Sequence, residues 1–278
     1  MNGSYVVTGG GRGIGRAVAE RLVAAGGTVV AIDRDPAGLA WMKGHAGEER
    51  LIGLAGDAAD PRVAELAADA AEAAAPLAGW VNNAAVFRDA SVHSSAARQV
   101  CELIAVNLDL ALTGCATAVR RFLAARSPGA IVNVSSHQAR QAVPGSLPYV
   151  TAKAAIEGMT RALAVEYGPR GIRVNAVAPG SVHTERYAAY LAAHGQEAAA
   201  RIKEQMAAVH PLGRVADAHE VASAITYLLS PEAGFITGAT LPVDGGRTVL
   251  AHDPEARTNP GAVAATARRR DQRAPGPW

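Results

Sequence analysis

A short apolar segment that leads into a glycine-rich loop and then into a helix constrains the fold of this chain more than any other feature. Residues Ser4–Thr8 (SYVVT) suit a buried strand, and the loop Gly9–Gly15 (GGGRGIG) follows directly. The alanine-rich run Arg16–Ala25 comes next, with amphipathic spacing. Glycines let the backbone approach a pyrophosphate, and a helix N-terminus offers free amides and a partial positive charge. The order strand, loop, helix therefore predicts a nucleotide-binding unit, where a plain glycine turn would explain only one of these glycines.

Strands and helices alternate along most of the chain. We expect strands over 4–8, 28–32, 51–55, 79–82, 130–135, 172–178 and 239–243. We expect helices over 13–25, 61–75, 97–126 with a break around Asn107, 149–167 and 217–230. This alternation predicts an α/β fold with a Rossmann-like, doubly wound parallel sheet of about seven strands in three α/β/α layers. The segments AIVNVS and IRVNAVA are apolar enough to be central strands covered on both faces.

An acidic residue, Asp33, ends the second expected strand, about twenty residues past the loop. A carboxylate at this place can bind both hydroxyls of an adenosine ribose and would repel a 2′-phosphate. Arg12 and Arg34 could instead receive the 2′-phosphate of NADP. Because a desolvated carboxylate beside a phosphate dianion is costly, Asp33 favours NAD. The alternative of a simple turn residue fits Asp35, which precedes Pro36, better than Asp33.

Tyr149 and Lys153 stand four residues apart in PYVTAK, and Ser136 lies thirteen positions upstream. Four residues make about one helical turn, so both side chains point to the same side. An ammonium beside a phenol favours the phenolate and lowers a tyrosine pKa that is ordinarily about 10. Such a tyrosine can exchange a proton with an alcohol or a carbonyl, and the Ser136 hydroxyl could hold the same oxygen. Taken alone, this pair also describes an ordinary surface pair on a helix.

With these motifs in their order, the chain resembles the compact, single-domain branch of the short-chain dehydrogenase/reductase family. The resemblance covers roughly residues 1–250, which we expect to form a single NAD-binding and catalytic domain. The matching segments are TGGGRGIG (8–15), Asp57 after the third strand, NNAA (82–85), Asn107 in AVNLDLAL, Ser136 in IVNVSS, YVTAK (149–153), Pro179-Gly180 with Thr184, and ITGATLPVDGG (236–246).

The resemblance implies roles for individual residues. Tyr149 would be the acid/base, Lys153 would bind the nicotinamide ribose and lower the tyrosine pKa, and Ser136 would position the substrate oxygen. Asn107 would kink its helix and hold a water that links Lys153 to solvent. The implied cofactor-binding residues, Tyr149 and Lys153 included, are Gly9, Arg12, Gly13, Ile14, Gly15, Asp33, Arg34, Asp57, Ala58, Asn83, Ala84, Pro179, Gly180, Val182 and Thr184.

Two segments are expected to shape the substrate pocket. The first follows Ser136 and contains His137, Gln138, Arg140, Gln141 and Val143. The second follows Pro179-Gly180 as a lid and contains Glu185, Arg186, Tyr187, Tyr190 and His194. Their polar content indicates a hydroxylated or anionic substrate, although solvent-facing lid residues would explain it equally well. The family's usual NNAG reads NNAA here, with Ala85 in place of glycine.

Composition favours a soluble enzyme in a reducing cytoplasm. The two cysteines, Cys101 and Cys115, lie in helical segments and are expected to be buried thiols. No apolar run approaches the ~20 residues of a membrane span, and the first strand begins near Ser4, so neither membrane association nor a signal peptide is expected. The histidines are scattered, so no metal site is predicted. The tail 251–278 is rich in Pro, Ala and Arg and is expected to be largely disordered, although it could instead reach a neighbouring subunit.

Net charge gives no sign of nucleic-acid binding. The chain carries 27 basic and 25 acidic residues, a net charge of +2, and the tail accounts for all of it.

The sequence therefore predicts an NAD-dependent oxidoreductase that interconverts a secondary alcohol, sugar or polyol and a ketone, with a small-molecule substrate. The resemblance implies a homotetramer. Two alternatives stay open: an NADPH-dependent 3-oxoacyl-carrier-protein reductase, and a dinucleotide-sensing module without turnover. Asp33 argues against the first alternative, and the presence of Ser136, Tyr149 and Lys153 argues against the second.

Overall fold

A seven-stranded parallel sheet forms the centre of the computed structural model, which describes residues 2–251. Its strand order is β3-β2-β1-β4-β5-β6-β9, and every neighbouring pair is parallel. The order reverses between β1 and β4, where parallel sheets of this kind open a crevice at the carboxyl ends of the strands. The strands are β1 Ser4–Thr8, β2 Thr28–Asp33, β3 Leu51–Ala55, β4 Leu77–Asn82, β5 Gly129–Val134, β6 Ile172–Pro179 and β9 Thr240–Val243.

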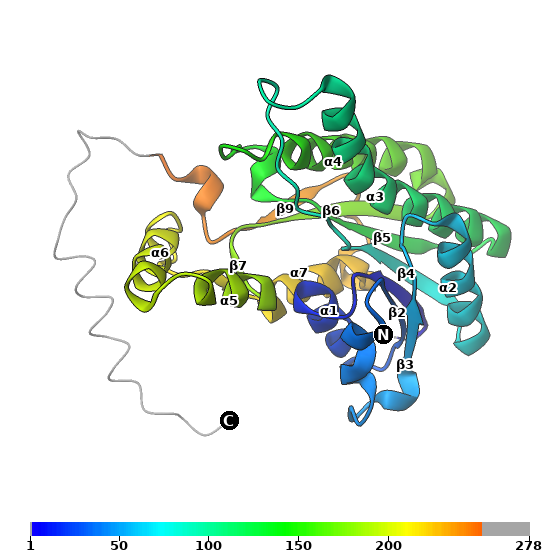
Figure 1. Ribbon diagram of the computed structural model, residues 1–278. Helices are drawn as coiled ribbons and strands as arrows, with labels where there is room; N and C mark the ends of the chain where they lie inside the picture. The colour runs from blue at the N-terminus through cyan, green and yellow to red at the C-terminus, as the bar shows by residue number, and fades with distance from the viewer. Residues whose placement is uncertain (1, 252–278) are drawn as a thin grey trace. The chain divides into compact units, whose positions relative to one another are not determined.

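Helices cover both faces of this sheet, as Figure 1 shows. One face carries α1 Gly13–Ala24 and α7 Ala218–Leu229, and the other carries α2 Pro61–Ala74, α3 Ala97–Ala125 and α4 Leu147–Tyr167. Alternate residues of β1 supply the two cores, because successive side chains of a strand point to opposite faces. Val7 packs with the α1 and α7 side, and Val6 packs with the α2 and α3 side. The predicted three-layer, Rossmann-like fold is confirmed.

Helix α3 differs from expectation in one respect. It is helical throughout Ala97–Ala125, so the predicted break around Asn107 is wrong. The reason is that the Asn107 amide does not compete for the helix's own backbone. Its Oδ1 accepts from the Val86 N–H at 2.9 Å, and its Nδ2 donates to the Val86 carbonyl at 2.8 Å. The side chain thereby fastens the segment after β4 to α3 and leaves the helix intact.

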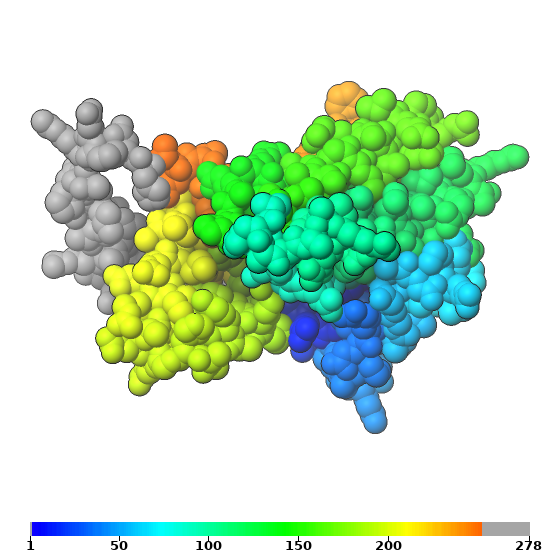
Figure 2. All heavy atoms as spheres, turned by 45° about the horizontal axis from the view of Figure 1, so that its top comes forward, coloured from blue at the N-terminus to red at the C-terminus, as the bar shows by residue number. Residues whose placement is uncertain are grey.

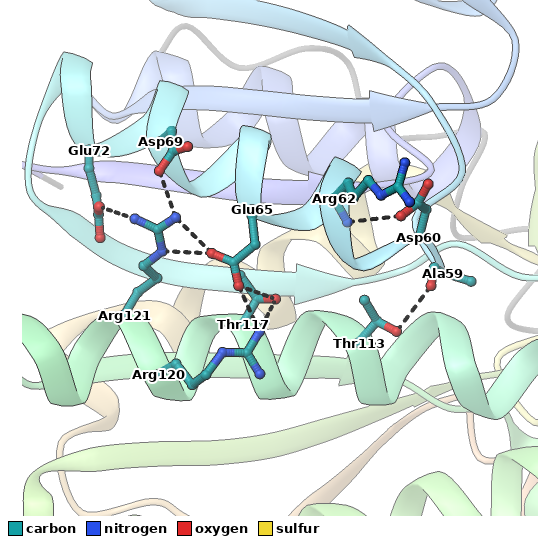
Figure 3. A network of polar contacts seen from close by, with 10 residues as sticks. All are labelled: Ala59, Asp60, Arg62, Glu65, Asp69, Glu72, Thr113, Thr117, Arg120 and Arg121. Atoms are coloured by element: carbon teal, nitrogen blue, oxygen red, sulfur yellow. Dashed lines mark hydrogen bonds and ion pairs between the residues drawn. The ribbon is translucent and has the colours of Figure 1, made fainter.

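Polar side chains tie α2 to α3 on the outer side of these helices. Arg121 donates to Glu65, Asp69 and Glu72 at 2.6–3.0 Å, and Arg120 reaches Glu65 at 2.7 Å (Figure 3). The Glu65 carboxylate thus accepts hydrogen bonds from both arginines, and these bonds hold the pKa of Glu65 below its usual value. This network clamps α2, which packs mainly on β1 and β2, to α3, which packs mainly on β4.

A second polar network lies fully inside the protein, between the sheet and helices α3 and α4. Asn82 at the end of β4 donates to Asn133 Oδ1 at 2.8 Å and accepts from Trp80 Nε1 at 3.0 Å. Asn133 donates in turn to Thr160 Oγ1 on α4 at 2.9 Å. Buried amides require such partners, so this network fixes how β4, β5 and α4 meet.

The segment between β6 and α7 contains elements that the sequence analysis did not predict. It holds β7 Val182–His183, α5 Glu185–Ala192, α6 Gln196–Ala208 and β8 Ala216–Asp217, with β7 and β8 paired in parallel. Thr184 caps α5 by accepting from the Tyr187 N–H at 3.4 Å. Figure 1 shows α5 and α6 standing to one side of the sheet. The expected lid is therefore a pair of helices.

The two cysteines, both expected to be buried, differ in exposure. Cys115 is buried as expected, but Cys101 is exposed on α3, so that part of the prediction is wrong.

Among the described residues only α3 has the length and apolar composition of a membrane span. In the structure α3 packs against the sheet through side chains such as Leu110, Val119 and Phe122. Residues up to Thr248 form one compact unit, and the predicted disorder of 251–278 concerns residues that lie almost wholly outside the described ones.

Candidate active site

A cleft of about 740 Å³ opens at the carboxyl ends of the central strands. Figure 2 shows its mouth where the yellow residues of α5 and α6 face the teal segment that precedes α3. All but two of the predicted site residues line it, the exceptions being Gly15 and Asn107. Those that line it are Gly9, Arg12, Gly13, Ile14, Asp33, Arg34, Asp57, Ala58, Asn83, Ala84, Ser136, Tyr149, Lys153, Pro179, Gly180, Val182 and Thr184.

The glycine loop forms one wall of this cleft, and several of its glycine positions have no room for a side chain. A Cβ at Gly15 would collide with the Gly9 carbonyl, and a Cβ at Gly11 would lie 2.7 Å from Asp33 Oδ2. Gly9 and Gly13 adopt φ values of 66° and 54°, which favour glycine. Gly15 thus lets α1 pack against the loop from behind, which is why it does not face the cleft.

The N-terminus of α1 is left free to bind an anion. Its N-cap residue, Arg12, makes no side-chain cap, and the first turn carries no acidic residue. Unpaired amides at such an end, together with the helix dipole, attract phosphate groups. This wall is a cradle into which a pyrophosphate fits.

Asp33 lies beside the loop as expected, held by two backbone amides. Its Oδ2 accepts from Gly11 N at 3.0 Å, and its Oδ1 accepts from Asp35 N at 3.1 Å. Asp57, at the end of the next strand, accepts from Ala59 N at 3.0 Å in a turn of the same kind. Both carboxylates are therefore fixed at the edge of the cleft where the adenosine half of a dinucleotide would lie.

Asn83 joins the end of β4 to the loop. Its Nδ2 donates to the carbonyls of Thr8 and Gly9 at 3.0 and 3.1 Å. The backbone amides of Asn83 and Ala84 both donate to Thr8 Oγ1 at 3.0 Å. The first and fourth strands thus end in a single hydrogen-bonded unit, which positions Ala84 on the cleft wall.

Ser136, Tyr149 and Lys153 lie together on the opposite wall and are all buried. Ser136 follows β5, and its Oγ accepts from Gln138 N at 3.1 Å, which fixes the hydroxyl at the start of a 3₁₀ turn, η3 His137–Ala139. Tyr149 and Lys153 come from the first turns of α4, with the Lys153 ammonium 5.5 Å from the tyrosine ring centroid. The spacing in the sequence correctly predicted that these side chains meet.

Electrostatics at Tyr149 differ from the sequence expectation. Burial raises the pKa of Tyr149 to about 12, opposed by a hydrogen bond from Ser136 and by the charge of Arg186. Burial also lowers the pKa of Lys153 to about 8. The Lys153 ammonium donates to the Val134 carbonyl at 2.6 Å. The expected lowering of the Tyr149 pKa by Lys153 stays a prediction.

An aromatic and cationic stack that the sequence analysis missed covers Tyr149. Phe87 stacks on the tyrosine ring with centroids 4.7 Å apart and an interplanar angle of 30°. The Arg186 guanidinium of α5 lies 3.8 Å from the Phe87 ring centroid. The stack joins three segments far apart in sequence, so only the apolar character of Phe87 just after NNAA could have hinted at it. It connects α5 to the residue predicted to be the acid/base.

The two expected substrate segments contribute unequally. From the first, His137, Gln138 and Val143 line the cleft, whereas Arg140 and Gln141 do not. Arg140 instead pairs with Glu157 at 3.4 Å, and Gln141 donates to the Thr248 carbonyl at 3.0 Å. From the second, Glu185, Arg186 and Tyr187 line it, whereas Tyr190 and His194 stack on each other elsewhere. Met206 and Arg247 also face the cleft and were not predicted.

Possible metal ligands lie apart from one another in the part of the chain that the structure describes. No group of three or more His, Cys, Asp or Glu side chains gathers there in a way that could hold an ion. Beside the glycine cradle, the polar groups of the cleft include the phenol of Tyr149, the hydroxyl of Ser136, the ammonium of Lys153 and the imidazole of His137. Such a set can bind a dinucleotide and move a proton at a substrate oxygen.

Comparison with known proteins agrees with this arrangement. A family model described as enoyl-(acyl carrier protein) reductase matches residues 9–248. The 2-(S)-hydroxypropyl-CoM dehydrogenase 3 of Xanthobacter autotrophicus is 35% identical over 256 residues, which cover 90% of this chain and 98% of that protein. The galactitol 2-dehydrogenase (L-tagatose-forming) of Cereibacter sphaeroides is 37% identical, with coverage of 87% and 94%. A crystal structure from Agrobacterium tumefaciens, assigned as a 2-deoxy-D-gluconate 3-dehydrogenase and holding NADP, superimposes with a TM-score of 0.76 at 30% identity, covering 89% of this chain and 97% of that one.

Proposed function

The chain belongs to the short-chain dehydrogenase/reductase family, and on that premise we propose that it is an NAD-dependent oxidoreductase that interconverts a secondary alcohol and a ketone. The observation that carries the proposal is the meeting of Ser136, Tyr149 and Lys153 on one wall of a cleft whose other wall is the glycine loop. Relatives named as dehydrogenases of hydroxylated compounds, galactitol among them, support the substrate class.

The residues present fit a nicotinamide dinucleotide. The crowded glycines of the loop and the uncapped start of α1 suit the pyrophosphate. Asp33 and Asp57 are fixed at the end where the adenosine would bind, and Lys153 lies at the other end, beside Tyr149. When bound, the nicotinamide supplies the acceptor for the hydride that leaves the substrate carbon.

Residues of the chain itself transfer the proton of the substrate hydroxyl. Ser136 holds the substrate oxygen through its fixed hydroxyl, and the Tyr149 oxygen takes the hydroxyl proton during oxidation and returns it during reduction. The hydrogen bond from Ser136 and the Arg186 charge both favour the phenolate against the cost of burial. The Lys153 ammonium is directed by the Val134 carbonyl, which leaves its other protons for the cofactor ribose. Phe87 and Arg186 exclude water from the face of the phenol.

The choice of NAD over NADP rests on Asp33. Its carboxylate is held against Gly11 and would face a 2′-phosphate at close range. Arg12 and Arg34 line the same cleft and favour NADP, and the relative from A. tumefaciens holds NADP. The repulsion between the Asp33 carboxylate and a 2′-phosphate outweighs the attraction of the two arginines. Their long side chains can turn away from the phosphate, whereas the carboxylate is held in place.

A panel of secondary alcohols, polyols and sugars tests the proposal with NAD and NADP at mildly alkaline pH. Reduction of NAD, followed by nicotinamide absorbance, is expected for some members of the panel. The absence of turnover with every member and both cofactors would remove the proposed activity, and binding of NAD without turnover would favour a sensing module.

Assembly into a homotetramer is part of the same proposal. Apolar side chains stand exposed on the outer faces of α3 and α4, among them Leu112 at 46% and Val165 at 80% exposure. Tyr227 on α7, at 42%, and Leu241 on β9, at 38%, form a second exposed apolar region. Two such regions suit the two kinds of contact that a tetramer requires.

A further inference from the structure

One imidazole nitrogen in the cleft wall has no partner among the described residues, 2–251. His137 is 5% exposed, and its Nδ1 lies 3.1 Å from the Pro179 carbonyl. Its Nε2 is buried and makes no hydrogen bond to any of those residues. A buried polar atom left unpaired costs about 1–3 kcal/mol, so a site that retains one usually has a ligand for it.

The chemical nature of that nitrogen follows from its neighbour. A carbonyl oxygen can only accept, so the hydrogen that joins Nδ1 to Pro179 belongs to the imidazole. Burial, with the charge of Arg247 adding to it, lowers the pKa of His137 to about 4, and His210 acts in the same direction while Asp244 opposes. The ring is therefore neutral, and Nε2 is a lone-pair acceptor.

Nearby His210 shows what a structural histidine looks like in this protein. Its Nδ1 lies 2.6 Å from the Met206 carbonyl, and its Nε2 accepts from Ser181 N at 3.2 Å. Both nitrogens are thus used in holding the segment after β6. His137 has the same first contact but lacks the second.

A second acceptor lies beside His137. Gln138 Oε1, in the same 3₁₀ turn, is also buried and makes no hydrogen bond within the described part of the chain. Arg247 lines the cleft with them and uses one nitrogen on Ser181 Oγ at 2.9 Å, which leaves further guanidinium donors. This turn begins immediately after Ser136, and both acceptors belong to residues that line the cleft together with Ser136 and Tyr149.

These groups select a hydroxyl among the chemical groups that a substrate could present. A carboxylate or phosphate could accept from Arg247, but it has no hydrogen to donate and would leave His137 Nε2 and Gln138 Oε1 unpaired. An ammonium would be repelled by Arg247 and Arg186. A hydroxyl can donate to an acceptor and accept from Arg247 at the same time.

We propose that His137 Nε2, with Gln138 and Arg247, binds a second hydroxyl of the substrate, so that the enzyme acts on diols and polyols in preference to simple secondary alcohols. This inference rests on the proposed function and specifies its substrate class. His137, Gln138 and Arg247 line the same cleft as Ser136 and Tyr149, so a second hydroxyl on the bound substrate can reach them.

Paired substrates test this. Butane-2,3-diol is compared with butan-2-ol, and cyclohexane-1,2-diol with cyclohexanol. The wild type is expected to favour each diol by about 10–10²-fold in kcat/KM, since one buried acceptor gains its partner. His137→Asn keeps a donor for Pro179 but deletes the Nε2 position, and it should bring the diol preference close to one. His137→Gln, which restores a polar atom further out, should recover part of the preference.

The matched control is His219→Asn, an exposed histidine on α7 that does not line the cleft. It should leave the diol preference unchanged. A second readout is the Nε2 resonance of His137 in ¹⁵N-histidine-labelled protein, identified by its loss in His137→Asn. That resonance should shift when butane-2,3-diol is added with the oxidised cofactor present.

Each outcome is decisive. Equal efficiency with diols and simple alcohols would overturn the inference and leave the proposed function standing. If no compound is turned over with either cofactor, the proposed function fails, and the resonance then decides alone. If the His137 Nε2 resonance does not shift when butane-2,3-diol is added, the proposed hydroxyl-binding subsite is wrong.

Discussion

Replacing Asp33 by asparagine should change the cofactor preference by about two orders of magnitude. Asparagine can still accept from Gly11 N, where the Asp33 carboxylate now accepts at 3.0 Å, so the loop should keep its geometry. What the substitution removes is the negative charge. The experiment therefore isolates electrostatics from the shape of the site.

The magnitude follows from the half-buried position of this side chain. Two unit charges ~4 Å apart interact by ~1 kcal/mol in water and by ~4 kcal/mol near a protein surface. Relief of repulsion should thus favour NADP by about 2 kcal/mol. NAD should lose about 1 kcal/mol, because its ribose hydroxyls would exchange a charged acceptor for a neutral one. Together these effects amount to a change of about 10²-fold in the ratio of kcat/KM values.

The assay measures kcat/KM for NAD and for NADP with one alcohol at one ionic strength. Asp35→Asn is the matched control, since Asp35 is exposed, caps the next 3₁₀ turn and does not line the cleft. It should leave the ratio nearly unchanged. A wild type that already prefers NADP, or an Asp33→Asn ratio equal to that of the wild type, would refute the reasoning.

The remaining predictions concern pH, stability and assembly. Alcohol oxidation should accelerate as pH rises, because it requires the Tyr149 phenolate and burial raises the pKa of that phenol; ketone reduction should slow over the same range. Arg186→Gln should move both profiles to higher pH, since the Arg186 charge lowers this pKa, and unchanged profiles would exclude that contribution. Asn133→Val should lower the free energy of unfolding by about 2–4 kcal/mol in urea titrations, because it leaves Asn82 and Thr160 without their buried partner; a loss below about 1 kcal/mol would show that the network is dispensable. Light scattering should give four times the chain mass of 28.4 kDa, and a monomer mass would contradict the proposed assembly.

The core of the fold could be predicted because its signals are local. Each central strand is a short apolar run bounded by glycine or polar residues, and the residues that end the first strands, such as Asp33 and Asn83, face the cleft for that reason. The spacing of Tyr149 and Lys153 determines their common side in the same way.

Other features depend on contacts across the chain and could not be predicted from such signals. The stack of Arg186 on Phe87 and of Phe87 on Tyr149 joins three separate segments. Asn107 does not break α3, because its side-chain amide forms hydrogen bonds with the backbone of Val86. The Lys153 ammonium donates to the Val134 carbonyl, a contact that the sequence does not indicate. Helices α5 and α6 did carry a local signal, namely the cap residue Thr184 and the break at Gly195, which the interpretation as a lid loop overlooked.

The most direct test of the central claim is Tyr149→Phe, measured for both cofactor binding and turnover. The phenol hydroxyl acts on the substrate, so NAD should bind within a few-fold of the wild type. Turnover of the best alcohol should fall by at least ~10²-fold, the usual contribution of a positioned acid or base. A variant that kept turnover within a few-fold of the wild type would contradict the assignment of Tyr149, and with it the proposed mechanism.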